Sequence, residues 1–120
     1  MEPEIVKTFR FEAAHRLPNA PENHKCRQMH GHSYRVDIHV TGEADPETGW
    51  VIDFGQIKQA VEPLVNTLDH RFLDDIEGLA NSTSEMLAKY FWDKIKVNLP
   101  GLSAITVWES DTSRCIYRGK

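Results

Sequence analysis

The sequence predicts a single α+β domain over residues 1–120, with two helices on one face of an antiparallel sheet. Three observations support this prediction. Apolar and polar residues alternate over long segments near both ends of the chain, as they do in half-buried strands. Two segments between them repeat apolar residues at helical spacing. A length of 120 residues and a hydrophobic content of 40% suit one ordered core.

The expected strands follow from this alternation and from the turn signals between them. They cover residues 5–13, 33–41, 50–54, 103–109 and 115–118. The third strand should form a short hairpin with the second, because residues 42–49 contain Asp-Pro and Thr-Gly turn signals. A loop rich in Pro and Asn, from Pro18 to about Gln28, separates the first two strands.

Two helices are expected between the third and fourth strands. Asp53 can cap the first, whose core-facing residues are Ile57, Val61, Leu64, Val65 and Leu68. Pro63 lies inside this pattern and should kink or split the helix. The second begins near residues 82–85, where Ser-Thr-Ser-Glu forms a capping-box pattern, and stops before Pro100. The element order is therefore β-β-β-α-α-β-β, with four main strands and one short hairpin strand.

Charge and composition argue against several classes of function. The net charge of −4 gives no global positive field for nucleic acid or acidic membranes, so we expect neither as a partner. No apolar run resembles a signal peptide or a membrane span, and a cytoplasmic protein is expected. Thiols stay reduced in that compartment, so Cys26 and Cys115 are not expected to form a disulfide.

Three of the six histidines form a candidate metal site: His15, His30 and His32. Each continues the apolar face of its strand, so the imidazoles should converge in a partly dry environment, as metal binding requires. Imidazole-only ligation favours zinc, and three ligands leave one coordination position open, as in catalytic sites. The alternative is a closed structural site with Cys26 as the fourth ligand, but structural zinc usually takes more thiolates.

Two further motifs are candidates for acid–base chemistry. Cys26 lies between Lys25 and Arg27 in the loop before His30, and these cations would favour its thiolate form. Asp69 precedes His70, and a carboxylate beside an imidazole can orient it and raise its proton affinity. The Asp-His pair could equally serve only to end the first helix.

Glu109 is a candidate for ligand binding. It shares the strand parity of Ile105 and Val107, so its carboxylate should point inward at the end of its strand. A buried carboxylate needs a partner, and the edge of an aminopyrimidinone ring would provide one. The alternative is an exposed glutamate at a strand end.

Six motifs in order resemble the 6-pyruvoyl-tetrahydropterin synthase family, and more closely its bacterial branch, the 6-carboxy-tetrahydropterin synthases of queuosine biosynthesis. The resemblance runs from Phe9 to Gly119. The motifs are FEAAH at 11–15, Cys-x-x-x-His-Gly-His at 26–32, GWVIDF at 49–54, LDH at 68–70, TSE at 83–85, and Glu109 followed by CIYRG at 115–119.

The resemblance implies the tunnelling fold, in which trimeric barrels stack as a homo-hexamer. It also implies a role for each matching residue. The implied roles are Zn²⁺ ligation by His15, His30 and His32, proton abstraction by Cys26, a proton relay of Asp69, His70 and Glu109, pterin anchoring by Glu109, and pterin contacts across a subunit boundary by Thr83, Ser84 and Glu85.

The implied substrate is the small molecule 7,8-dihydroneopterin triphosphate, and the implied products are 6-carboxy-5,6,7,8-tetrahydropterin, acetaldehyde and triphosphate. Zinc on the side-chain hydroxyls would acidify the adjacent C–H. Cys26 would take the proton and His70 would act as the opposing acid, without a redox cofactor. One alternative is the same fold stopping at 6-pyruvoyl-tetrahydropterin. Another is a non-catalytic zinc- or pterin-binding module, which would need neither Cys26 nor the Asp-His pair.

Two positions depart from the family pattern. Ser82 stands where proline is expected, a harmless change because serine can cap a helix. Arg114 stands where a small residue is usual, and it could alter the rim of the pocket. The residues that hold the triphosphate are not apparent; charge alone nominates Arg16, Lys25, Arg27 and Arg71.

Overall fold

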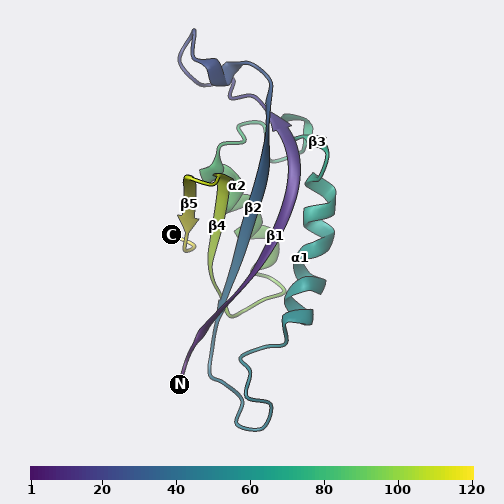
Figure 1. Cartoon of the computed structure of the whole chain (residues 1–120), viewed down its shortest axis with the longest axis vertical. Coiled ribbons are helices and arrows are strands. Elements are labelled where there is room, and N and C mark those ends of the chain that lie inside the picture. The colour runs from purple at the N-terminus through teal and green to yellow at the C-terminus, as the bar shows by residue number, and fades with distance from the viewer.

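Five strands form one sheet in the computed structural model, which describes residues 1–120 (Figure 1). Their order across the sheet is β3-β1-β2-β4-β5. The strands are β1 (Glu4–His15), β2 (His30–Thr41), β3 (Arg71–Phe72), β4 (Leu102–Ser110) and β5 (Ser113–Tyr117). Every neighbouring pair is antiparallel except β3, which runs parallel to β1. The predicted α+β class is confirmed.

Two helices, α1 (Phe54–Leu68) and α2 (Ser84–Ile95), pack against this sheet. Figure 1 shows α1 beside β1 and α2 behind β2 and β4. Two short 3₁₀ turns complete the fold, η1 (Lys25–Arg27) in the loop between β1 and β2, and η2 (Leu73–Asp75) after β3. The loop that carries η1 projects beyond the helices at one end of the elongated molecule (Figure 1).

The strand register explains which face is buried. Phe11 lies opposite Tyr34, and Val36 lies between Phe9 on one side and Val107 on the other. These apolar side chains therefore share the face that the helices cover. The Phe11 and Tyr34 rings stack with centroids 5.0 Å apart. Both helices add side chains to the same core as the strands, and this shared packing holds the strands in place.

The predicted hairpin strand at residues 50–54 is wrong. β2 pairs with β1 along its whole length and with β4 from Arg35 to Val40, so the end of β2 that a hairpin strand would need has no free edge. Residues 50–54 instead lead into α1, where the Asp53 side chain accepts a hydrogen bond from the Gly55 N–H at 2.9 Å. The additional strand of the sheet is instead β3, whose two residues are too few to show an alternating pattern in the sequence.

The helix boundaries also differ from expectation in two places. Pro63 does not split α1, because buried side chains on both sides of it hold the helix to the core: Ile57, Val61, Val65 and Leu68. The cap of α2 is Thr83, whose Oγ1 accepts from the Met86 N–H at 3.1 Å. Ser82 lies one residue earlier and is fully buried, so its hydroxyl serves elsewhere.

Candidate active site

Three imidazoles meet where β1 ends and β2 begins. His15 lies directly opposite His30 in the strand register, and His32 lies on the same face two residues further along β2. The ring centroids are 4.5 Å apart for His15 and His30, 5.0 Å for His15 and His32, and 4.9 Å for His30 and His32. One nitrogen from each ring lies within 4.8 Å of the other two. The predicted convergence of the three histidines is confirmed.

Hydrogen bonds to backbone carbonyls orient two of these rings. His15 Nδ1 donates to the Ser82 carbonyl at 3.0 Å, and His30 Nδ1 donates to the Gln28 carbonyl at 2.7 Å. A carbonyl oxygen can only accept, so the proton is on Nδ1 and the Nε2 lone pair is free for a metal. Nε2 of His15 and Nε2 of His32 are both buried without a hydrogen-bond partner. Buried polar atoms rarely lack partners, so this donor set fits a divalent metal such as zinc.

Burial also sets the charge of the cluster. Removal from water lowers the pKa of His15 below its ordinary value, although the hydrogen bond to Ser82 acts in the opposite direction. Burial likewise lowers the pKa of His32, against the opposing effect of the Glu109 carboxylate. Both shifts favour the neutral imidazole, which is the form that binds metals.

A cavity of about 360 Å³ lies beside the imidazoles and is lined by Lys25, Cys26, His30, His32 and Glu109. Glu109 Oε1 lies 3.6 Å from His32 Nε2, so this carboxylate faces the histidines, as its strand parity indicates. Cys26 is a partly buried free thiol in η1. The structure thus brings a thiol, a carboxylate and the candidate metal ligands to one opening.

Asp69 and His70 form a pair that lies apart from this cavity. His70 Nδ1 is 3.0 Å from Asp69 Oδ2, and its side chain is 78% exposed. Asp69 Oδ1 accepts from the Glu12 N–H at 2.8 Å; this bond and the neighbouring His70 lower the pKa of the Asp69 carboxyl. Asp69 also ends α1, with its N–H bonded to the Val65 carbonyl. Asp69 therefore ends the helix and also lies in contact with the imidazole of His70, while an acid–base role for the pair stays a prediction.

His70 has a left-handed backbone, with φ of 60°, an uncommon conformation for a residue with a side chain. It lines a depression together with Glu12, His32, Ser33 and Arg71, and of the residues that line this depression only His32 also lines the cavity of Cys26. Within one chain the thiol and His70 are therefore not brought together.

The candidate pterin contacts at the start of α2 are also outside the cavity. Thr83 caps the helix, and Ser84 Oγ donates to Glu85 Oε1 at 3.0 Å. Glu85 is exposed, and it adds to the effect of burial in raising the pKa of Cys115. Glu85 therefore lies near Cys115 of β5, and none of the three residues lines the cavity of Cys26 in its own chain.

Sequence reasoning missed three residues that support His15. Ser82 Oγ lies 3.3 Å from His15 Nδ1 and donates to Asp74 Oδ1 at 3.2 Å, and the Tyr34 hydroxyl also lies 3.3 Å from that nitrogen. Burial raises the pKa of Tyr34, which keeps its hydroxyl protonated. Tyr34 could have been found from its parity with His32, whereas nothing local marked Asp74.

Arg114 lies away from the Cys26 cavity of its own chain, and its effect on the pocket rim stays a prediction. Its guanidinium lies over the Trp108 ring at 4.5 Å, on the sheet face opposite the histidines, and Arg35 lies over the same ring at 3.9 Å. Trp108 Nε1 donates to Asp37 Oδ2 at 2.8 Å, which fixes the ring. Arg114 is therefore part of a stack remote from Cys26.

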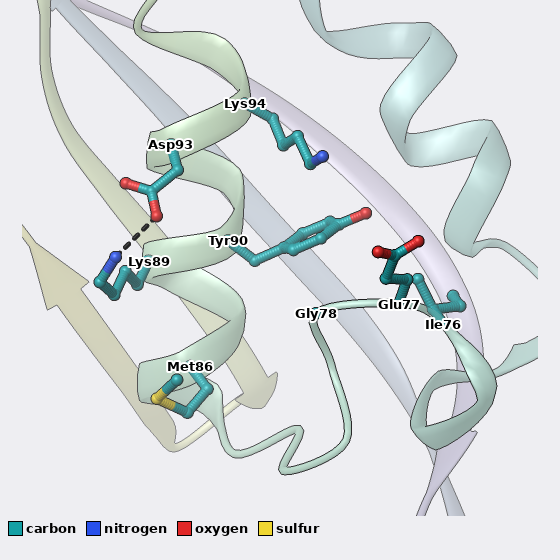
Figure 2. A pocket seen from close by; sticks show the side chains of 8 residues that line it. All are labelled: Ile76, Glu77, Gly78, Met86, Lys89, Tyr90, Asp93 and Lys94. Carbon is teal, nitrogen blue, oxygen red and sulfur yellow. Dashed lines mark hydrogen bonds and ion pairs between the residues drawn. The ribbon is translucent and has the colours of Figure 1, made fainter.

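A larger cavity of about 670 Å³ lies between α2 and the segment after η2 (Figure 2). Two of its charged groups pair with each other, since Lys89 Nζ lies 2.7 Å from Asp93 Oδ2, and the Lys94 ammonium lies 5.5 Å from the centre of the Tyr90 ring. Figure 2 shows Tyr90 pointing across the opening toward Glu77. The larger cavity is lined by no thiol or histidine, so the candidate catalytic and metal-binding groups lie at the smaller cavity.

The fold and the smaller cavity together define a class. This is an α+β protein with three histidines that could hold a metal ion, and with a thiol and a carboxylate beside them. The chain belongs to the 6-pyruvoyl tetrahydropterin synthase family, whose model matches residues 4–120. No helix of the protein is both long and apolar enough to cross a bilayer.

Relatives in this family carry two activity names. The chain is 42% identical over 119 residues to the 6-carboxy-5,6,7,8-tetrahydropterin synthase of Synechocystis sp., covering 94% of this chain and 91% of that protein. It is 34% identical over 133 residues to the 6-pyruvoyl tetrahydrobiopterin synthase of Homo sapiens, covering 98% and 92%. The solved 6-pyruvoyl tetrahydropterin synthase of Caenorhabditis elegans superposes with a TM-score of 0.92 at 30% identity, covering 100% of this chain and 97% of that one.

Proposed function

We propose that this protein is a zinc-dependent lyase that converts 7,8-dihydroneopterin triphosphate and water to 6-carboxy-5,6,7,8-tetrahydropterin, acetaldehyde and triphosphate, in queuosine biosynthesis. The observation that carries the proposal is the cavity where oriented imidazoles, the Cys26 thiol and the Glu109 carboxylate meet. The 42% identity to a protein named 6-carboxy-5,6,7,8-tetrahydropterin synthase supports the choice of product.

Each side chain has a role that its position permits. His15, His30 and His32 would hold the zinc, which when bound supplies Lewis-acid polarisation of the substrate's side-chain hydroxyls. Cys26 would take a proton from the side-chain carbon beside it as a general base. The Glu109 carboxylate would accept hydrogen bonds from the ring N–H and amino groups of the pterin, because two acceptor oxygens match two adjacent donors.

The proton donor would come from a neighbouring chain. His70 is exposed and lies outside the Cys26 cavity, so a second copy would have to present it, with Asp69 as its orienting partner. Thr83, Ser84 and Glu85 would contact the pterin across a subunit boundary in the same way. We therefore include a homo-hexamer, built as a dimer of trimers, in the proposal.

The open edges of the sheet support this assembly. β5 has no partner on its outer side, and β3 covers only Ala13 and Ala14 of the twelve residues of β1. Long unpaired edges promote pairing between chains, and edge-to-edge pairing around a three-fold axis would close a barrel.

Incubation with 7,8-dihydroneopterin triphosphate tests the reaction. Mass spectrometry should find the carboxy product, and an aldehyde assay should find acetaldehyde in equal amount. A pyruvoyl product without acetaldehyde would instead favour the activity that the Homo sapiens relative is named for, since the same zinc, thiol and anchor can serve both. Binding of the pterin without any turnover would favour a non-catalytic module.

A further inference from the structure

Lys25 lies at the mouth of the candidate active site without an acidic partner. It is the first residue of η1, adjacent to Cys26, and it lines the same cavity as His30, His32 and Glu109. None of the ion pairs of the protein includes it. An exposed lysine is ordinary, but this one is the only lysine or arginine that lines the cavity.

None of the arginines near the site lines this cavity. The Arg27 guanidinium donates to the Pro18 carbonyl at 3.0 Å and to the Ala20 carbonyl at 2.9 Å, so it fixes the loop that carries η1. Arg71 lines the depression of His70, and Arg114 lies over Trp108 on the opposite face of the sheet. Arg27 thus holds Lys25 in place rather than competing with it for a ligand.

The electrostatics of the cavity make this lysine consequential. The protein carries a net charge of −4, and Glu109 adds a carboxylate to the cavity itself, so no general field attracts an anion. An anionic substrate therefore needs a local positive charge. A lysine ammonium binds phosphate oxygens as a compact point charge with three donors.

We propose that Lys25 is the phosphate subsite of this cavity, where it binds the phosphate chain of a pterin whose ring lies at Glu109 and whose hydroxyls lie at the histidines. The identity of the anion rests on the proposed function. Lys25 then determines specificity, because it distinguishes the triphosphate from the unphosphorylated pterin. Glu109 and the imidazoles contact the ring and the hydroxyls, which are the same in both molecules.

Titration of the zinc-loaded protein with inorganic triphosphate, followed by calorimetry, tests the subsite without requiring turnover. Lys25→Gln should weaken triphosphate binding about ten-fold or more, and Lys25→Arg should retain most of it, because a charged hydrogen bond is lost only in the first. Lys58→Gln is the matched control: Lys58 is exposed on α1, 3.7 Å from Glu62, and should bind as the wild type does. Zinc content is measured after each titration, since triphosphate can chelate the metal.

Phosphate-free 7,8-dihydroneopterin separates this role from others. Its affinity should be the same in the wild type and in Lys25→Gln. Equal triphosphate affinity in the two proteins, or no triphosphate binding by the wild type, would overturn the subsite. If Lys25 served only the reactivity of Cys26, iodoacetamide would alkylate that thiol more slowly in Lys25→Gln while triphosphate binding stayed intact, which also overturns it. An inactive protein that still binds triphosphate through Lys25 would contradict the proposed lyase activity alone.

Discussion

His15 Nδ1 donates to the backbone carbonyl of Ser82 at 3.0 Å, so the loop before α2 sets the orientation of a side chain at the end of β1. Both residues are fully buried. Asp74 Oδ1 joins the two segments, because it accepts from Ser82 Oγ at 3.2 Å and from the Arg16 N–H at 3.1 Å. One carboxylate oxygen therefore fixes both the strand end that carries His15 and the loop that orients its ring.

Removing that carboxylate should weaken the metal site without touching a ligand. We expect Asp74→Ala to lower zinc affinity about 10–100-fold, the usual range for the loss of a group that orients a metal ligand. Competition with a chromogenic chelator measures the change. Asp75→Ala is the control, because Asp75 is exposed and adjacent and makes no side-chain hydrogen bond in the structure. Equal affinity in both variants would show that Ser82 holds its position without Asp74.

The ligand set itself is tested by metal content. Purified protein should carry about one zinc per chain, and His15→Ala, His30→Ala and His32→Ala should each lose most of it. Cys26→Ala should retain zinc, because in an open site the three imidazoles are the only ligands that the protein supplies. Elemental analysis that found Cys26→Ala as depleted as the histidine variants would favour the closed structural site.

The zinc-free protein should become less stable as pH falls below about 6.5. Burial lowers the pKa of His15 and His32 from an ordinary value of 6.5, so near that pH the unfolded chain binds more protons than the folded one. The stabilisation from these two neutral imidazoles is complete above the pKa of histidine in the unfolded chain. It is lost as pH falls through the lowered pKa values of the folded protein. The midpoint of urea unfolding should therefore drop from neutral pH to about pH 5, more steeply than in His15→Gln. Identical slopes would mean that the buried imidazoles do not cause the loss.

The alternation of side chains along the strands was enough to predict that the three histidines and Glu109 share one face of the sheet. His15, His30 and His32 continue the apolar faces of two strands, and because those strands are adjacent, the rings meet. Glu109 reached the same face by the same alternation along β4. Parity works here because period-two alternation leaves a half-buried strand only one way to face its core.

The remaining features depend on contacts that no local pattern records. The edge needed by a strand at residues 50–54 was already occupied, because β4 comes from the far end of the chain to pair with β2. Asp74 supports His15 through a loop that lies far from it in sequence. The family resemblance implied a proton relay of Asp69, His70 and Glu109, but within one chain only Glu109 lines the cavity of Cys26, and no local pattern records that separation.

Substitutions of Cys26 and Glu109 should impair the enzyme in different ways, one in reaction rate and the other in pterin affinity. Cys26→Ala should slow the reaction about 10²–10⁴-fold while the pterin still binds, since only a proton acceptor is removed. Glu109→Ala should instead weaken pterin binding sharply, because unpaired ring donors are left in the cavity. Separate measurements of pterin affinity and single-turnover rate distinguish the two. Undiminished affinity in Glu109→Ala would show that this carboxylate does not anchor the ring.

The shared site predicts complementation between two inactive variants. Cys26 lines the cavity, whereas His70 is exposed and lies outside it, so the proposed site takes one residue from each of two chains. Cys26→Ala and His70→Ala should each be nearly inactive alone. When the two are unfolded together and refolded as mixed assemblies, random assortment should leave about one site in four with both native residues.

The mixed protein should therefore recover about a quarter of wild-type activity, a gain that is large against either variant alone. Refolding each variant separately and then combining the finished assemblies is the control, because chains that do not exchange cannot build a hybrid site. Light scattering on the mixture should report the same assembly as the wild type. A fully active monomer, or no recovery in mixed assemblies of native size, would mean that Cys26 and His70 act within one chain or that His70 is not the proton donor.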